Sequence, residues 1–289
     1  MHYIEAKGIL NARNGMNLYR GCQHGCIYCD ARSKCYQIDH IFEDIAVKGN
    51  ALELLEQALK SKRKKMMVGM GSMSDPYMHC EKELQHTRKC LEIVNRYGFG
   101  FTLITKSDLV LRDLELIKSI NEKSKAVVQM TLTTFDEDLC CILEPKVATT
   151  RQRFETLMKL KESGIPTVVW LTPILPFIND TEENLRGILD YCIQAGVKGI
   201  ICFDMGLTLR SGNREYFYKK LDEHFPGMKQ KYISAFGDSY YCTSPQNRQL
   251  MKIFRSVCKE NGIMYDTDEI FEYLHTFEEK GLSEQLTLF

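Results

Sequence analysis

Short apolar runs alternate with amphipathic stretches between residues 14 and 204 of this 289-residue chain. The runs are rich in Val, Ile, Phe and Thr, and most are bounded by Gly or Pro, which is typical of strands. The stretches between them place apolar residues three and four positions apart, which is typical of helices. The pattern predicts strands over residues 15–20, 66–70, 99–105, 126–132, 166–171 and 198–204.

The helical stretches carry apolar stripes, most clearly over residues 51–59, 84–94 and 154–160. Three of the predicted helices are followed by a glycine that precedes a strand, namely Gly98, Gly164 and Gly196. Glycine often ends helices because it adopts left-handed backbone angles without strain. Repeated strand–helix units favour a parallel sheet. We therefore expect an α/β fold, a partial (βα)6 barrel, because residues 14–204 are too few for eight units.

The rest of the chain breaks this rhythm. It predicts helices near residues 214–224, 247–261 and 268–280, together with an aromatic-rich segment over residues 226–245. Because no long linker or low-complexity stretch separates this part, we expect it to pack against the barrel. The chain is thus divided into a lead-in over residues 1–13, a barrel core over 14–210 and a C-terminal helical and aromatic extension over 211–289.

Composition narrows the class of protein. The formal net charge is zero, so the chain as a whole generates no field that attracts nucleic acid, and a polyanion must be bound by a local patch. No stretch approaches membrane-spanning length, and residues 1–5 lack the features of a signal peptide. Twelve cysteines without such a signal indicate free thiols in a reducing compartment. We therefore expect a cytoplasmic protein with no membrane partner.

Three cysteines near the N-terminus, Cys22, Cys26 and Cys29, form a C-x3-C-x2-C run directly after the first predicted strand. A cubane iron–sulfur cluster normally takes four thiolates. A loop that offers three leaves one iron open to a small molecule, such as the amino and carboxylate groups of S-adenosylmethionine (SAM). Two alternatives remain open on spacing alone. The cysteines could bind zinc, with Cys35 or His24 as fourth ligand, or they could be ordinary core residues.

Small and polar residues follow the predicted strands. Ser72 and Asp75 follow the second strand, Lys106 follows the third, and Thr131 lies at the end of the fourth. In parallel barrels the chemistry gathers at the C-terminal ends of the strands. A lysine on the same rim as the cysteine loop is a natural partner for a carboxylate.

Several motifs in chain order are similar to those of radical SAM proteins, specifically the spore photoproduct lyase-like branch. The resemblance covers about residues 14–204 and rests on the runs Met16-Asn17-Leu18-Tyr19-Arg20-Gly21-Cys22, His24-Gly25-Cys26-Ile27-Tyr28-Cys29-Asp30, Ser74-Asp75-Pro76-Tyr77 with Glu81, Thr105-Lys106-Ser107 with Arg112-Asp113, Glu144-Pro145 with Arg153, and Pro173-Ile174-Leu175-Pro176 through Asn179-Asp180. It strongly favours the cluster over zinc.

The resemblance implies a role for each matching position. The three cysteines would ligate a [4Fe–4S] cluster that reduces SAM, and the resulting 5′-deoxyadenosyl radical would abstract hydrogen from a substrate. Tyr28 would lie near the SAM adenine. Ser72 and Asp75 would help to hold the SAM amine, Lys106 would contact its carboxylate, and Thr131 stands where the family usually has a serine that contacts SAM.

The chain departs from the authentic lyase at two positions. Ser72 stands where the lyase has its hydrogen-donating cysteine, and Asp30 stands where it has a tyrosine. A serine O–H bond is too strong to replace a thiol as hydrogen donor, so repair by the lyase's route would need another thiol. Cys140 and Cys141, expected in a loop after the fourth strand, are the candidates.

Two features suggest partners. The C-terminal residues Gln285, Leu286, Leu288 and Phe289 resemble the peptide by which bacterial proteins bind the DNA sliding clamp, although a frayed or packed tail is the alternative. The extension interleaves cations with aromatics, as nucleic-acid stacking surfaces do, although packing over the open barrel explains them too. These residues are Arg210, Arg214, Tyr216, Tyr218, Lys219, Lys220, Lys229, Lys231 and Tyr232.

The leading hypothesis is thus a radical SAM enzyme that acts on a nucleic acid, foremost DNA, and receives its electron from a donor such as flavodoxin or ferredoxin. One alternative is a radical SAM enzyme that modifies a peptide or small molecule. The other is a noncatalytic iron–sulfur module that docks on the clamp.

Overall fold

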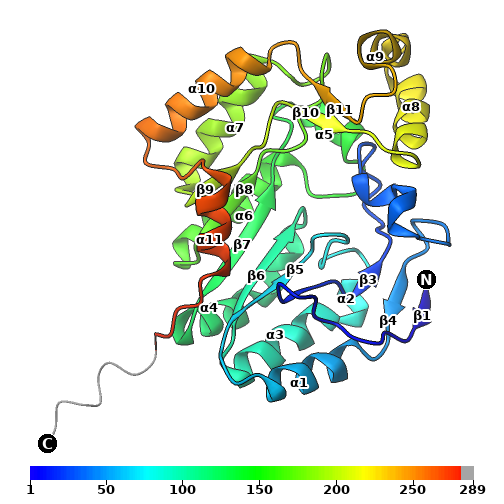
Figure 1. Cartoon of the computed structure of the whole chain (residues 1–289). Coiled ribbons are helices and arrows are strands. Elements are labelled where there is room, and N and C mark those ends of the chain that lie inside the picture. Colours follow the sequence, from blue (N-terminus) through cyan, green and yellow to red (C-terminus); the bar gives the residue numbers. More distant parts are fainter. Residues whose placement is uncertain (281–289) are drawn as a thin grey trace, which may run out of the picture.

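The computed structural model describes residues 1–280 and places a six-stranded parallel sheet at the centre of the molecule (Figure 1). The spatial order of the strands follows the chain, as successive strand–helix units produce. The strands are β2 (Gly15–Met16), β5 (Met67–Met70), β6 (Gly100–Thr105), β7 (Ala126–Thr131), β8 (Thr167–Trp170) and β9 (Gly199–Ile201). The prediction of an α/β partial (βα)6 barrel is confirmed.

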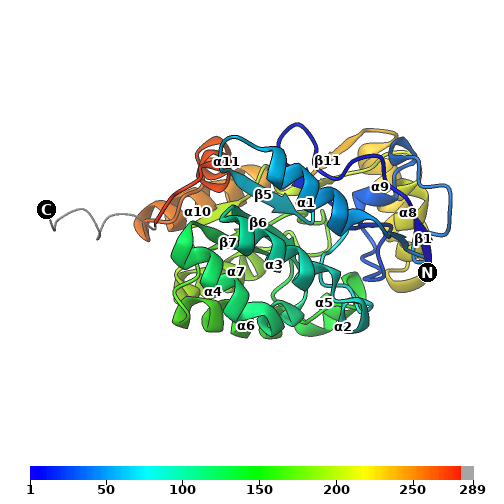
Figure 2. The same ribbon diagram turned by 90° about the horizontal axis from the view of Figure 1, so that it is seen from below.

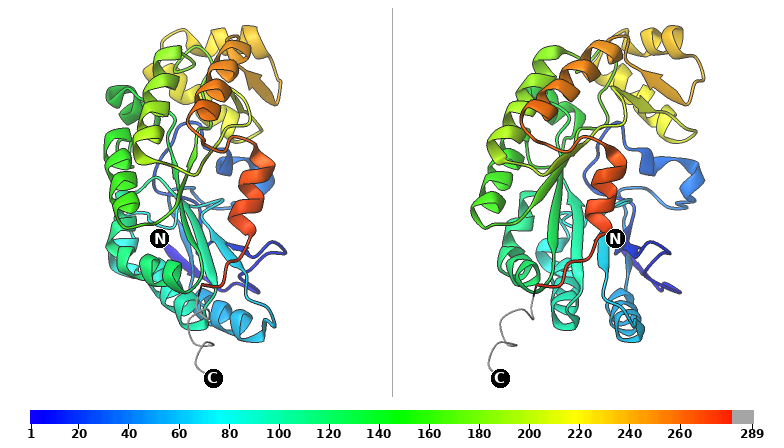
Figure 3. Two further views of the ribbon diagram at one scale, coloured as in Figure 1. Left: turned by 90° about the vertical axis from the view of Figure 1, so that its left-hand side faces the viewer. Right: turned by 60° about the vertical axis from the view of Figure 1, so that its left-hand side comes forward.

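The crossover helices cover one face of this sheet, which we call the outer face (Figures 2 and 3). The longer ones are α1 (Ala51–Ser61), α3 (His86–Tyr97), α4 (Leu114–Lys123), α6 (Thr150–Glu162) and α7 (Glu182–Ala195). Shorter pieces are α2 (Glu81–Leu84), α5 (Glu137–Leu143) and the 3-10 helices η1 (Asp30–Arg32), η2 (Lys34–Tyr36) and η3 (Asp108–Asp113). Gly98, Gly164 and Gly196 have positive φ, as expected of helix stops.

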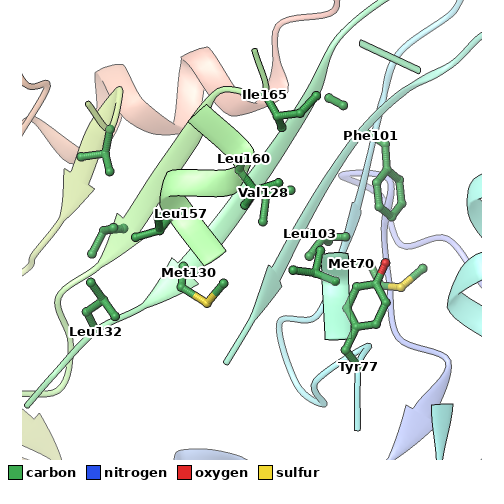
Figure 4. Close-up of a cluster of buried hydrophobic side chains, with 14 of the residues drawn as sticks. Met70, Tyr77, Phe101, Leu103, Val128, Met130, Leu132, Leu157, Leu160 and Ile165 are labelled. Carbon is green, nitrogen blue, oxygen red and sulfur yellow. The ribbon is translucent and has the colours of Figure 1, made fainter. Parts of the chain in front are cut away.

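Alternation along the strands separates the two faces of the sheet. The outer face is apolar and forms the core with the helices, as Figure 4 shows for Phe101, Leu103, Val128, Met130, Leu157 and Leu160. The opposite face, which we call the inner face, carries polar side chains that bridge neighbouring strands. Gln129 donates to the Thr102 hydroxyl (2.8 Å), and the Trp170 indole donates to Gln129 (2.7 Å). The side chains that continue this row toward the strand ends therefore open into the barrel.

The first predicted strand is wrong as a single element. Its first part, β2, belongs to the barrel sheet, but β3 (Tyr19–Arg20) joins a second sheet with β4 (Ala46–Lys48) and β1 (His2–Ile4). The chain crosses between the sheets at Asn17, whose side-chain oxygen accepts from the Met73 amide (3.0 Å). The lead-in therefore contributes a strand of its own.

The C-terminal extension packs against the barrel, as expected. It contains β10 (Gly206–Thr208), α8 (Asn213–His224), α9 (Met228–Phe236), β11 (Tyr241–Thr243), α10 (Asn247–Glu260) and α11 (Thr267–His275). The sequence missed α9 and both strands, and α11 ends before residue 280. β10 pairs with β11 in an antiparallel sheet. Among the described residues, no helix has the length and apolar character needed to cross a bilayer.

Candidate active site

The cysteine loop, residues 22–29, connects β3 to η1. Gly21 precedes it with φ +82°, and a Cβ there would lie 2.3 Å from the Phe42 carbonyl oxygen, so only glycine fits. The Cys22 amide donates to that same carbonyl (3.0 Å). The backbone thus fixes the point at which the loop leaves the three-stranded sheet of β1, β4 and β3.

The thiols of this loop are shielded to different degrees: Cys26 is buried, and Cys22 and Cys29 are partly buried. Burial raises the pKa of Cys22 to about 12, although backbone N–H groups of His24 and Asp75 act to lower it. Burial also raises the pKa of Cys26 and Cys29. Without a metal the thiols therefore hold their protons, and a bound metal has to displace them.

The surroundings of the loop bear on which metal it suits. The proposed fourth ligands of a zinc site are engaged elsewhere, because His24 Nδ1 lies 3.4 Å from Asp75 and Cys35 lies 3.5 Å from Arg210. Within residues 1–280, no three His, Cys, Asp or Glu side chains surround a single ion position. A [4Fe–4S] cluster makes a different demand, since each thiolate binds its own iron. The donor set of three thiols fits such a cluster with one iron left open.

Asp75 braces the turn after β5. Its carboxylate accepts from the Tyr77 amide (2.8 Å), the Thr105 hydroxyl (2.7 Å) and the Lys106 amide (2.7 Å). These bonds tie the end of β5 to the end of β6. Both oxygens of Asp75 are thus already bonded to protein donors. The residue therefore holds the turn after β5 against the end of β6.

Lys106 continues the inner-face row of β6, and its ammonium lies 5.9 Å from the centre of the Tyr28 ring. Burial acts to lower the pKa of Lys106, but the nearby Cys26 and Glu144 outweigh it and raise the pKa. Among residues 1–280 the ammonium has neither a hydrogen bond nor an ion pair, and only the backbone amide of Lys106 donates to Asp75. A half-buried cation beside the cysteine loop is suited to an anionic group such as the SAM carboxylate.

Two further candidates lie on the same rim. Ser72 is exposed, and its hydroxyl accepts from Asn17 (3.3 Å). Thr131 is buried at the end of β7, where alternation directs it to the inner face with Gln129. Ser72, Asp75, Lys106 and Thr131 therefore lie at the ends of β5, β6 and β7, and Tyr28 lies in the cysteine loop itself.

The expectation that Cys140 and Cys141 lie in a loop is wrong, since both belong to α5. Cys140 is buried, and its sulfur lies 3.1 Å from Arg153 and 3.4 Å from the Thr150 hydroxyl. Cys141 is exposed and lines a cavity of about 320 Å³ with Gly25 of the cysteine loop and residues of α8. Both candidate hydrogen donors thus lie on α5, whose last residue, Leu143, accepts from the Ile27 amide of the cysteine loop (3.0 Å).

Sequence reasoning missed three parts of the site. The Asn17 side chain accepts from the turn after β5. Glu144 and Arg153 form a buried ion pair that bonds to Tyr28 of the cysteine loop. Phe203 exposes its ring at the strand ends. The first three residues stand in the motifs that carried the family resemblance, which marked them without assigning a role. Phe203 lies inside the strand predicted over residues 198–204 but after the observed β9, and it carried no other signal.

Comparison with known proteins decides the family. The model of the radical SAM superfamily matches residues 16–217, which is more than half of the chain. The chain belongs to the radical SAM superfamily. This radical SAM protein is therefore an enzyme that uses a [4Fe–4S] cluster and SAM, as the sequence predicted. The alternative of a noncatalytic module is thereby set aside.

Two curated relatives show how widely such chains occur. The uncharacterized protein MJ0683 of Methanocaldococcus jannaschii is 34% identical over 181 residues, which cover 62% of this chain and 67% of that protein. The uncharacterized protein Rv2578c of Mycobacterium tuberculosis is 26% identical over 246 residues, which cover 83% of this chain and 72% of that protein. Neither name states a reaction.

Two solved structures have folds similar to that of this radical SAM enzyme. A spore photoproduct lyase variant with bound AdoMet and dinucleoside spore photoproduct has a TM-score of 0.65 at 13% identity, over 91% of this chain and 80% of that one. Streptococcus suis SuiB bound to precursor peptide SuiA has a TM-score of 0.52 at 12% identity, over 90% of this chain and 49% of that one. The predicted likeness to spore photoproduct lyase is confirmed for the fold.

Proposed function

We propose that this radical SAM enzyme abstracts hydrogen from a nucleic acid, foremost a DNA lesion or a modified DNA base. The observation that carries the proposal is the inner face at the strand ends. There, beside the residues assigned to SAM, lies aromatic surface that includes Phe203, which is 55% exposed. An exposed aromatic ring next to the SAM site suits an unstacked base.

Each site residue has a part in this proposal. Cys22, Cys26 and Cys29 ligate the cluster, and when bound it supplies one electron that cleaves SAM to a hydrogen-abstracting radical. Lys106 donates to the SAM carboxylate, and Tyr28 lies near the adenine. Ser72 lies near the SAM amine, and Asp75 acts by holding that turn in place. Thr131 contacts SAM from the end of β7.

Aromatic side chains support a base as substrate. The Trp170 ring lies 6.2 Å from Phe203 and 6.0 Å from Phe271 of α11, so the three rings form one wall of the inner face. Stacking on aromatic rings is a general mode of binding single-stranded nucleic acid. A solved spore photoproduct lyase with this fold holds a dinucleoside, which is consistent with a nucleotide substrate in this chain.

The cation-rich surface of the extension does not support the proposal, because its side chains are largely occupied. Arg214 donates to the carbonyls of Leu209 and Ser239 (2.9 and 2.8 Å), and Tyr232 is fully buried. Lys229 pairs with Asp222 (2.7 Å). These residues hold the extension together, so the packing interpretation of their composition is favoured.

A peptide substrate is the second candidate function. The observation that favours it is the match to SuiB, which carries a precursor peptide in its structure. The two candidates share the cluster, SAM and the inner face, and they differ only in what enters the barrel.

Anaerobic turnover distinguishes the candidates. The enzyme, a reductant and SAM are incubated with ultraviolet-irradiated DNA prepared from deuterated thymidine. Deuterium in 5′-deoxyadenosine that depends on DNA supports the proposal, whereas SAM cleavage without such transfer contradicts it. Cys26→Ala is expected to lose iron and SAM cleavage. Cys90→Ala, which alters a buried core cysteine, is the matched control and is expected to keep both.

Two partners belong to the same proposal. An electron carrier such as flavodoxin or ferredoxin would reduce the cluster. The sliding clamp would bind the C-terminal peptide Gln285, Leu286, Leu288 and Phe289, which lies outside the described residues. Binding of the enzyme to purified clamp, lost when Leu288 and Phe289 are changed to Ala, would support the second partner.

A further inference from the structure

Two tyrosine–glutamate–arginine triads, each with a buried glutamate, flank the cysteine loop. The first triad consists of Tyr19, Glu81 and Arg112, and the second triad consists of Tyr28, Glu144 and Arg153. In each, the tyrosine hydroxyl donates to Oε1 of the glutamate and the arginine Nη2 pairs with Oε2. Tyr19 lies three residues before Cys22, and Tyr28 directly precedes Cys29. One triad thus holds each end of the loop.

The second triad connects the loop to the barrel. Arg153 comes from α6 and is fully buried, as is the Glu144 side chain. The second Nη of Arg153 donates to the Thr131 carbonyl at the end of β7 (2.7 Å). A continuous chain of polar contacts therefore runs from Tyr28 in the loop to a strand end that is expected to contact SAM.

Backbone bonds strengthen this connection. The Ile27 amide donates to the Leu143 carbonyl (3.0 Å), and the Lys146 amide donates to the His24 carbonyl (3.2 Å). The segment from residue 143 to 146 therefore runs along the cysteine loop, with Glu144 facing Tyr28. A shift of Glu144 would move the loop that carries the thiols.

The triads differ in where their carboxylates bond. Glu144 accepts from Tyr28, which lies within the cysteine loop between Cys26 and Cys29. Glu81 accepts from Tyr19, which precedes the loop, and from the Thr87 amide of α3 (3.0 Å). The chain therefore offers two buried carboxylates with similar partners, of which one bonds to the cysteine loop itself.

We propose that Glu144 and Arg153 are positioning residues that set the reduction potential of the cluster held by the cysteine loop. This inference rests on the proposed ligation by Cys22, Cys26 and Cys29. Reduction adds negative charge to the cluster, and a nearby carboxylate in a medium of low dielectric constant opposes it. Glu144 therefore lowers the potential, and Arg153 limits that effect.

Potentiometric titration of the reconstituted cluster, followed by electron paramagnetic resonance without SAM, tests the proposal. Glu144→Gln keeps the size of the side chain and removes its charge, so the midpoint potential is expected to rise. Arg153→Met is expected to lower it. Glu81→Gln is the matched control: it should reduce the melting temperature as Glu144→Gln does, and leave the potential unchanged.

Unchanged potentials in both Glu144→Gln and Arg153→Met, or an equal shift in Glu81→Gln, would overturn the proposal. Tyr28→Phe covers the case in which neither variant folds. It deletes one hydroxyl, and because Glu144 loses a donor that disperses its charge, the potential is expected to fall. No shift in that variant would also count against the proposal. A wild-type chain that holds no cluster would refute the proposed function itself, which is a different result.

Discussion

At the scale of single residues, two shielded lysines differ in what their ammonium groups contact. Lys125 donates to the Tyr273 carbonyl (2.8 Å) and pairs with Glu278 (2.6 Å). Lys106 lies near the Cys26 thiol and the Glu144 carboxylate, but within the described part of the chain its ammonium bonds to neither. A shielded cation needs a compensating partner, so the ammonium of Lys106 is the one suited to bind an anionic ligand group.

Lys106→Met is therefore expected to weaken SAM binding without loss of the cluster. One charge-assisted hydrogen bond contributes about 1.5–3 kcal/mol, which corresponds to roughly ten- to a hundredfold in the dissociation constant. Titration of the reconstituted enzyme with SAM measures the effect.

Lys125→Met is the control for that variant. It removes a lysine with satisfied partners, so it should lower the melting temperature and keep the SAM affinity. Equal SAM affinity in wild type and Lys106→Met would show that this lysine does not contact SAM.

The sequence revealed some residues of this site and concealed others for a physical reason. The cysteines and Lys106 are recognisable because their signal is local, either a short spacing or the end of a strand. The bond between Tyr28 and Glu144 joins residues 116 positions apart. No local pattern encodes such a contact, so motif resemblance marked Glu144 and Arg153 but their roles required the structure.

At the scale of elements, packing against the crossover helices decided whether a strand was predictable. The strands β5 to β8 lie inside the six-stranded sheet and β9 forms its edge, and all five carry apolar side chains toward the helices, so their pattern is clear. The strands β1, β4, β10 and β11 have three residues each and belong to the two smaller sheets, where no long apolar run marks them. The stripe over residues 84–94 appeared continuous, but Gln85 adopts φ +52° and divides α2 from α3.

The turn after β5 gives a prediction at this scale. Gly71 has φ +103°, and a Cβ there would lie 2.3 Å from the Ile104 carbonyl oxygen. Gly98 also has positive φ, +66°, but no atom lies within 4 Å of its Cβ position. Alanine at Gly98 should therefore cost only the left-handed strain, about 1–2 kcal/mol of the free energy of unfolding.

Gly71→Ala adds a backbone collision to the same strain. It should therefore lower the free energy of unfolding by at least about 1 kcal/mol more than Gly98→Ala does. It should also weaken SAM binding, because it displaces the turn that Asp75 ties to Lys106. Chemical denaturation and SAM titration of both variants provide the test. Similar losses of stability in the two variants, with SAM binding intact in both, would show that the turn after β5 accommodates a Cβ and does not position Lys106.

At the scale of the whole molecule, the extension closes the open barrel on two sides. Leu207, Phe217 and Tyr232 pack with Cys26 and Tyr28 of the cysteine loop in one apolar cluster. On the other side α11 packs on the inner face of β7, β8 and β9, as Figure 3 shows. The extension therefore packs against the loop that would hold the cluster on one side and covers inner-face side chains of β7 to β9 on the other.

Phe203 lies exposed just after β9 and gives the prediction that bears on the substrate. If a base stacks on the wall formed by Trp170 and Phe203, Phe203→Ala should weaken binding of single-stranded DNA by about five- to a hundredfold, since one stacked base contributes about 1–3 kcal/mol. Phe135→Ala is the control, because that ring packs against Tyr191 on the outer layer (5.3 Å) and should affect only stability. Fluorescence anisotropy with a labelled oligonucleotide measures both variants. DNA binding that is unchanged in Phe203→Ala, together with weaker binding of a peptide substrate, would favour the peptide-modifying alternative, because the same wall would then receive a different chain.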